Sequence, residues 1–276
     1  MLRTLMIAVA FLALGLQASA PSPESPDPSS PRPIPVMDTV FLEEMTWMEI
    51  RDALAAGKTT VIVATGGLEQ NGPYLATGKH NYILRATTQA IARKLGDALV
   101  APIVPFVPEG NIDPPSGHMR YPGTISVRES TYEALLKDIC GSLKTHGFKE
   151  IVLIGDSGGN QTGMKNVANE LNARWSDEPT RVHYLPEYYD YPAVAKWLES
   201  EGIQQVPEGL HDDFAITAMM MTVDPNTVRM KERGAAGKFS INGIDLAPAP
   251  KTIEWGKRII EFRADATVKA LEQARK

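Results

Sequence analysis

Short apolar segments alternate with longer amphipathic segments along most of the chain. Three of the apolar segments, 59–65, 98–106 and 150–155, are rich in β-branched residues, which is typical of strands buried on both faces of a sheet. A fourth strand is predicted at 181–185. Apolar residues at helical spacing predict helices over the segments 44–56, 80–95, 130–146, 161–175, 191–201, 213–222 and 252–274.

This alternation predicts the fold class. Strands that alternate with helices form a mainly parallel sheet, and helices then cover both of its faces. We therefore expect an α/β fold. In such sheets the active site lies beyond the carboxyl ends of the strands, so the loops that follow the strands are where chemistry should be found.

The first twenty residues have the pattern of an export signal. Arg3 precedes an apolar run of 12 residues, 5–16, and the small residues Ala18-Ser19-Ala20 follow as a signal-peptidase motif. The run is too short to span a bilayer as a helix. We expect residues 1–20 to be removed, which leaves a periplasmic or secreted protein without a membrane span. The alternative is a buried N-terminal helix.

Residues 21–36 are predicted to be a linker. They contain seven of the 21 prolines, mixed with Ser, Glu and Asp, and such a segment cannot bury a core. The globular domain is therefore expected to occupy 37–276.

Charge and cysteine content narrow the function classes. The 28 basic and 33 acidic residues give a formal net charge of −5, which argues against a nucleic-acid partner held by bulk electrostatics. Cys140 is the single cysteine, so no intrachain disulfide and no multi-cysteine metal site can form. Metal or acid–base chemistry must draw on the five histidines and on carboxylates.

Several loops after predicted strands carry such side chains. The residues that they can bring to one end of the sheet are Glu69, His80, His118, Asp156, Ser157, His211 and Asp212. Carboxylates combined with imidazoles suit a divalent metal such as zinc or manganese. The same set could also provide a general acid and base without a metal.

The string Gly-Asp-Ser-Gly-Gly at 155–159 spells the nucleophile motif of chymotrypsin-like proteases. Those proteases are built from antiparallel barrels, whereas this string ends a parallel-type strand and opens a helix. A serine nucleophile at a strand-to-helix turn remains an alternative for Ser157. The other alternative is that Gly158 and Gly159 only allow a tight turn.

Three motifs in this order resemble the creatininase (creatinine amidohydrolase) family. They are Gly-Leu-Glu-Gln-Asn-Gly-Pro-Tyr-Leu at 67–75, His-Met-Arg-Tyr-Pro-Gly-Thr at 118–124 and Gly-Asp-Ser-Gly-Gly-Asn at 155–160. The resemblance spans 59–172 and continues weakly to His211. It implies a three-layer α/β/α sandwich, one or two divalent metals, hydrolysis of a C–N bond in a cyclic or linear amide, and a homo-oligomer such as a hexamer.

The chain departs from the family at several ligand positions. Asn71 and Ser157 stand where the family has histidine ligands, His80 stands where it has an aspartate, and Ile216 falls at the position of a ligand glutamate. The second metal site has therefore lost its obvious ligands. A single site rebuilt from Glu69, His80 and Asp156 is predicted.

The resemblance therefore predicts an exported amidohydrolase that uses zinc or manganese and acts on a small-molecule amide. His211 corresponds to the family's proton-carrying histidine, and Asp212 would orient its imidazole. Ser157 and His118 complete the predicted catalytic set. The alternative is a catalytically inactive protein of the same fold that binds a small ligand without hydrolysing it.

Overall fold

The computed structural model of the chain describes residues 27–204, 213–238, 240–241 and 244–276. The chain divides into an N-terminal unit that ends at Pro35 and a second unit, 36–276. The predicted export signal lies outside the described residues. The described part of the predicted linker contains no helix or strand, and a turn at 28–30 is its main feature, with the Ser29 hydroxyl donating to the Asp27 carboxylate.

A four-stranded parallel sheet forms the centre of the second unit. Its strand order is β2 (Ala98–Val100), β1 (Thr60–Thr65), β3 (Glu150–Gly155) and β4 (Arg181–Tyr184). All six residues of β1 are buried, because this central strand is covered on both faces. The predicted parallel α/β fold is confirmed.

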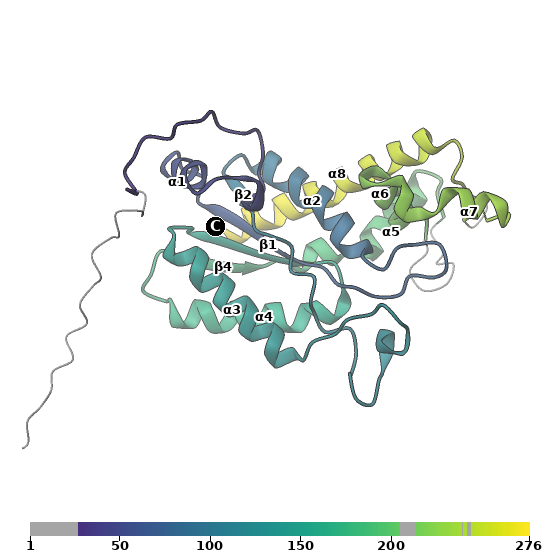
Figure 1. Ribbon diagram of the computed structural model, residues 1–276, viewed down its shortest axis with the longest axis horizontal. Helices are drawn as coiled ribbons and strands as arrows, with labels where there is room; N and C mark the ends of the chain where they lie inside the picture. Colours follow the sequence, from purple (N-terminus) through teal and green to yellow (C-terminus); the bar gives the residue numbers. More distant parts are fainter. Residues whose placement is uncertain (1–26, 205–212, 239, 242–243) are drawn as a thin grey trace, which may run out of the picture. The chain divides into compact units, whose positions relative to one another are not determined.

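Helices cover both faces of the sheet (Figure 1). On one face α3 (Glu129–Thr145) and α4 (Gln161–Arg174) pack Leu136 and Val167 against Val61 and Val63. Residues of α1 (Trp47–Ala55) pack against the same core. On the other face lie α2 (Lys79–Leu95) and the long α8 (Ala249–Ala274). Alternate residues of β1 therefore face different helical layers, as the period of a strand requires.

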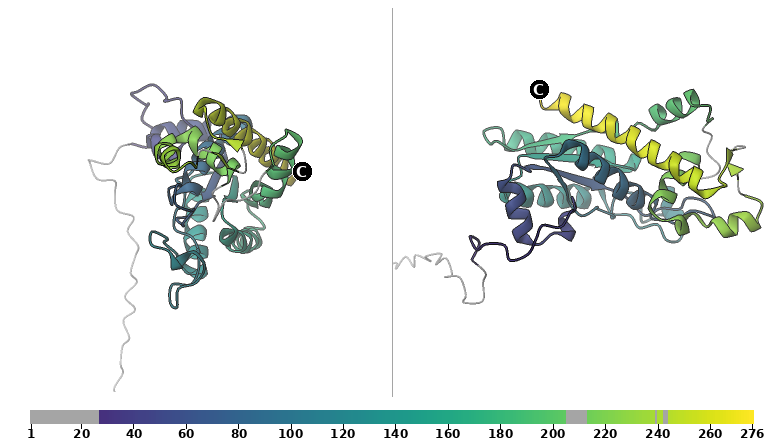
Figure 2. Two further views of the ribbon diagram at one scale, coloured as in Figure 1. Left: turned by 90° about the vertical axis from the view of Figure 1, so that its right-hand side faces the viewer. Right: turned by 90° about the horizontal axis from the view of Figure 1, so that it is seen from above.

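A further apolar cluster lies beyond the sheet. It is built from α5 (Tyr191–Ser200), α6 (Phe214–Val223) and α8. Between α6 and α8 the chain forms the short α7 (Met230–Ala235) and a hairpin of β5 (Ser240–Ile241) and β6 (Ile244–Asp245). Figure 2 shows α8 running along this side of the unit. A Cβ on Gly256 would lie 2.1 Å from the carbonyl oxygen of Ala218, so glycine lets α6 and α8 approach closely. None of the described helices is long and apolar enough to cross a membrane.

Two predicted elements differ from the structure for local reasons. The helix predicted over 44–56 begins only at Trp47, because Thr46 and Glu49 form a capping box that fixes its start. The strand predicted over 98–106 ends at Val100, and Val104 adds only an isolated bridge to Thr65. Prolines within 101–108 lack the N–H that a continuous ladder needs, so the chain runs on as a loop.

Side-chain amides tie the loops at the carboxyl end of the sheet together. The Nδ2 atom of Asn160, just after β3, donates to the carbonyl oxygens of Thr65 and Gly66 at the end of β1, each at 2.9 Å. A Cβ on Gly159 would lie 2.3 Å from the Pro108 carbonyl oxygen, so the loop after β2 can approach only a glycine there. The Gly-Gly-Asn motif therefore brings three loops together.

Candidate active site

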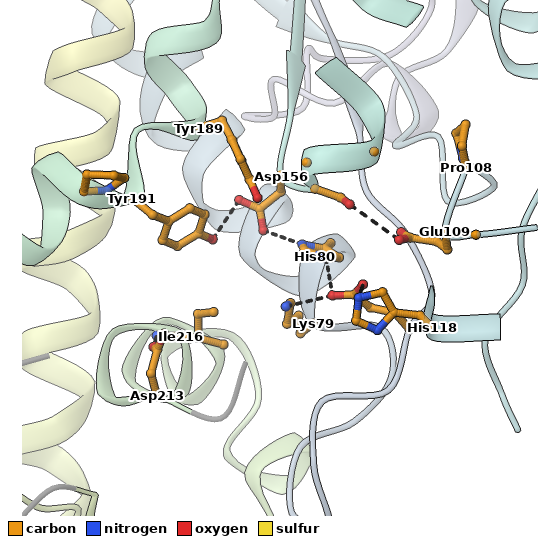
Figure 3. Close-up of a pocket in the computed structure, with 16 residues that line it drawn as sticks. Lys79, His80, Pro108, Glu109, His118, Asp156, Tyr189, Tyr191, Asp213 and Ile216 are labelled. Carbon is orange, nitrogen blue, oxygen red and sulfur yellow. Dashed lines mark hydrogen bonds and ion pairs between the residues drawn. The ribbon is translucent and has the colours of Figure 1, made fainter. Parts of the chain in front are cut away.

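A cavity of about 580 Å³ lies where these loops meet (Figure 3). The side chains used below line it, and they are Glu69, Lys79, His80, Glu109, His118, Asp156, Ser157 and Tyr191. They come from the loop after β1, the start of α2, the loop after β2, the turn after β3 and the start of α5. The carboxyl ends of the parallel strands thus hold this cavity, which is where the predicted site would lie.

Glu69 is a buried carboxylate that contacts three side chains of the cavity. Its Oε1 lies 2.9 Å from Nζ of Lys79 and 2.9 Å from Nε2 of His80, and its Oε2 lies 3.1 Å from Nε2 of His118. Asn71 holds the loop in place, because its Nδ2 donates to the carbonyl oxygens of Glu69 and Ala76, each at 3.0 Å. Asn71, where the sequence resemblance implies a ligand, therefore stabilises the loop through its Nδ2 atom.

His80 connects the two acidic sides of the cavity. Its Nδ1 lies 2.8 Å from Oδ2 of Asp156, while its Nε2 faces Glu69. Burial and the charge of Lys79 oppose protonation of the ring, but the hydrogen bonds to Asp156 and Glu69 outweigh them and raise the pKa of His80 above its usual value. If an ion were bound, Nε2 would give up its proton to contact it while Asp156 kept the proton on Nδ1, the arrangement common to metal-binding histidines.

Asp156 is fully buried and fully partnered. Its Oδ1 receives a hydrogen bond from Arg263 of α8 at 2.7 Å and one from the Tyr191 hydroxyl at 3.1 Å. Burial alone would raise the pKa of Asp156, but Arg263 and His80 together lower it to about 2. Arg263 also donates to the Tyr188 carbonyl oxygen at 3.0 Å, so the guanidinium is fixed in place.

Glu109 lies opposite Glu69 and is short of partners. Its Oε1 is buried and accepts no hydrogen bond from a described donor, while the Ser157 hydroxyl donates to its Oε2 at 3.5 Å. Burial and the nearby charge of Glu69 raise the pKa of Glu109 to about 8. Gly67 makes room for this carboxylate, because a Cβ there would lie 2.0 Å from Oε1 of Glu109 and the residue has a φ of +152°.

Glu69, His80 and Glu109 can hold a metal ion. Each offers one ligand atom, and the three atoms lie within 4.8 Å of one another. Two carboxylates and an imidazole suit zinc or manganese. A divalent ion would also supply the positive charge that the buried Oε1 of Glu109 lacks, so the residues fit such an ion.

The predicted site residues do not all reach this group. Glu69 and His80 belong to it, whereas Asp156 lies on the far side of the His80 ring, against Arg263. Among the described side chains, Ser157 contacts the carboxylate of Glu109 rather than an imidazole, and His118 contacts Glu69. His211 and Asp212 lie outside the described residues.

Sequence reasoning missed four side chains: Lys79, Glu109, Tyr191 and Arg263. Two had a detectable signal. Arg263 interrupts the buried stripe of α8 formed by Ile259, Ile260 and Ala264, and Glu109 lies in a loop that follows a strand. A cation on an apolar helix face needs a buried anion, which could have been sought.

Comparisons with known proteins identify the family and agree with the fold. The sequence model of a family described as Creatininase, creatinine amidohydrolase, matches residues 43–271. Creatinine amidohydrolase of Pseudomonas putida is 28% identical over 233 residues, which cover 79% of this chain and 88% of that protein. Mycofactocin precursor peptide peptidase of Mycolicibacterium smegmatis is 30% identical over 205 residues, covering 72% and 78% of the two chains. A crystal structure of creatinine amidohydrolase shares the fold, with a TM-score of 0.65 and 24% identity over 86% of this chain and 98% of that one.

Proposed function

The chain belongs to the creatininase family, and we propose that it hydrolyses a C–N bond of a small cyclic or linear amide at a centre that holds one divalent ion. The two similar proteins named above are hydrolases, and so is a third, the 3-dehydro-scyllo-inosose hydrolase of Thermotoga maritima. The predicted hydrolase class is therefore confirmed. The observation that carries the proposal is the buried pair Glu69 and Glu109 beside His80, with one carboxylate oxygen of Glu109 lacking a donor.

Glu69, His80 and Glu109 would hold the ion. When bound, it would polarise the amide carbonyl and lower the pKa of a water molecule. Zinc and manganese are both supported, because structurally similar creatininases include a manganese form and a Zn-Zn form.

The remaining side chains of the cavity would position groups and move protons. Asp156 would hold the His80 ring in one orientation through Nδ1. Hydrolysis transfers a proton from water to the departing nitrogen, and a nearby imidazole suits that transfer. His118, whose side chain is 26% exposed on the cavity side of Glu69, is one candidate carrier. His211, oriented by Asp212, remains the other, as the resemblance to the family implies.

A second candidate function is a protein that binds a small ligand without hydrolysing it. The supporting observation is that internal cations already neutralise two carboxylates of the cavity. Lys79 pairs with Glu69, and Arg263 pairs with Asp156. A centre that balances its charge in this way could have lost its ion.

Metal analysis combined with a hydrolysis screen separates the two functions. We expect about one zinc or manganese ion per chain after reconstitution, and hydrolysis of at least one member of a panel of amides and lactams. Glu109→Gln should lose the ion, whereas the matched exposed substitution Glu199→Gln on α5 should retain it. A reconstituted protein with neither ion nor hydrolysis would favour the ligand-binding function.

We also propose that the enzyme is exported and that its mature form lacks residues 1–20. The apolar run at 5–16 and the small residues that follow it support this. Sequencing the N-terminus of protein recovered from the periplasm or medium tests it, and a mature protein that begins at Met1 would contradict it. A homo-oligomer, as in the family, remains a prediction.

A further inference from the structure

Lys79 places a buried ammonium group directly against the candidate metal ligands. It is the first residue of α2, it is 1% exposed, and its Nζ lies 2.9 Å from Oε1 of Glu69. His80 contacts the same oxygen through Nε2. Figure 3 shows the lysine side chain lying close to the histidine. A buried charge is costly unless an opposite charge faces it, so this ammonium has a fixed place in the centre.

We propose that Lys79 is a resident cation that takes the place of a second divalent ion. The inference deepens the proposed function and rests on the single ion that this function requires. It assigns the second positive charge of the centre to the protein itself. The centre would therefore hold one ion where its family can hold two.

The ligand sets of the described residues support this assignment. Within that part of the chain, the three atoms of Glu69, His80 and Glu109 form one group that could hold an ion, and Asp156 already faces Arg263. The Nδ2 atom of Asn71 donates to backbone carbonyl oxygens, and its Oδ1, which is buried without a hydrogen-bond partner among the described residues, offers an ion only one neutral ligand atom. A second ion would therefore have to share Glu69 with the ammonium, and two cations at one carboxylate oxygen repel each other.

The position of Lys79 also allows it to contact substrate. An ammonium group has three N–H donors, and Glu69 is the acceptor found for it among the described residues. Lys79 lines the cavity, so its other donors can reach an oxygen of a bound amide. A fixed cation at a carbonyl oxygen stabilises the negative charge that develops there during hydrolysis. Lys79 would thus also perform the substrate-binding task of a second ion.

Zinc binding to the metal-free protein tests the inference without measuring activity. We expect the wild type to bind one zinc ion per chain. Lys79→Met, which keeps the length and packing of the side chain, removes the repelling charge and should bind zinc about tenfold more tightly or better in isothermal titration calorimetry. Lys257→Met, a matched change on the exposed face of α8, should bind zinc as the wild type does. A gain of less than threefold for Lys79→Met, or a loss, would overturn the inference.

Two further variants separate charge from folding. Lys79→Arg keeps the charge and should keep the wild-type zinc affinity. Lys79→Gln removes the charge but can still donate to Glu69, and it replaces Lys79→Met if that variant does not fold.

Failure of the proposed function has a different outcome. A wild type that binds no zinc would contradict the single-ion centre. It would overturn the inference as well, because Lys79 could then stand only in place of the first ion, whereas a wild type that binds zinc together with a Lys79→Met variant of unchanged affinity would overturn the inference alone.

Discussion

Buried carboxylates lie on both sides of the His80 ring, but their electrostatic environments are opposite. On the Nδ1 side, Asp156 faces Arg263, Tyr191 and His80, and its pKa is lowered to about 2. On the Nε2 side, two carboxylates face each other, and the Lys79 ammonium group pairs with one of them, Glu69. Burial and its neighbour raise the pKa of Glu109 to about 8.

The difference shows that the number of hydrogen-bond and ion-pair partners, rather than the degree of burial, distinguishes the roles of these carboxylates. Asp156 is 0% exposed and Glu109 is 6% exposed, so their access to water is nearly equal. A carboxylate with all its partners resists change and can orient a neighbour. A carboxylate that lacks donors gains most from an added cation or proton. We therefore assign support to the Asp156 side and chemistry to the Glu69 side.

The largest effect is expected when the supporting side is broken. Asp156→Asn leaves the Arg263 guanidinium buried without its counter-charge, which should lower the free energy of unfolding by about 3–5 kcal/mol. Urea unfolding of the metal-free protein measures this. Asp190→Asn, an exposed cap of α5, should change it by less than about 1 kcal/mol. If the free energy of unfolding fell equally in the two variants, the ion pair of Asp156 and Arg263 would not be what stabilises the Asp156 side of the cavity.

An intermediate effect is expected from removing both members of the pair. Asp156→Asn combined with Arg263→Met removes the uncompensated charge and should cost about 1–3 kcal/mol less than the sum of the single variants. A double-mutant cycle by urea unfolding gives this coupling energy. Additive losses would show that the two groups act independently, despite the 2.7 Å between them.

The smallest effect on stability is expected on the other side. Glu109→Gln removes one of two facing carboxylates, so the metal-free protein should keep its stability or gain up to about 1 kcal/mol. The zinc-dependent rise in melting temperature should be lost in the same variant, because a ligand is missing. A loss of several kcal/mol without metal would mean that Glu109 supports the fold, and the contrast with Asp156 would disappear.

Local pattern predicted most of the fold because the buried strands and amphipathic helices are encoded by neighbouring residues. The strand predicted over 150–155 matches β3 residue for residue, and the family and hydrolase class are confirmed. The candidate site was predictable only in part. Glu69 lies in the loop after β1 and His80 follows it at the start of α2, but Arg263 reaches Asp156 from a helix 107 residues further along the chain. No local spacing encodes that contact.

Glu109 and Lys79 escaped sequence reasoning for another physical reason. The significance of Glu109 depends on the missing side chain of Gly67, which lets the two loops approach. That of Lys79 depends on the turn that begins α2 and directs the side chain towards Glu69. Each is a property of packing between segments, so it becomes visible only once the loops are placed.

The use of Arg263 from α8 has a consequence for the order in which the protein is made. A ribosome adds residues in sequence order, and α8, which begins at Ala249, follows every candidate ligand in the chain. A nascent chain that has reached residue 248 already contains every candidate ligand but not the guanidinium that neutralises Asp156. The centre can therefore be completed only after α8 has been synthesised, and a product that terminates before α8 would carry these ligands without the charged partner of Asp156.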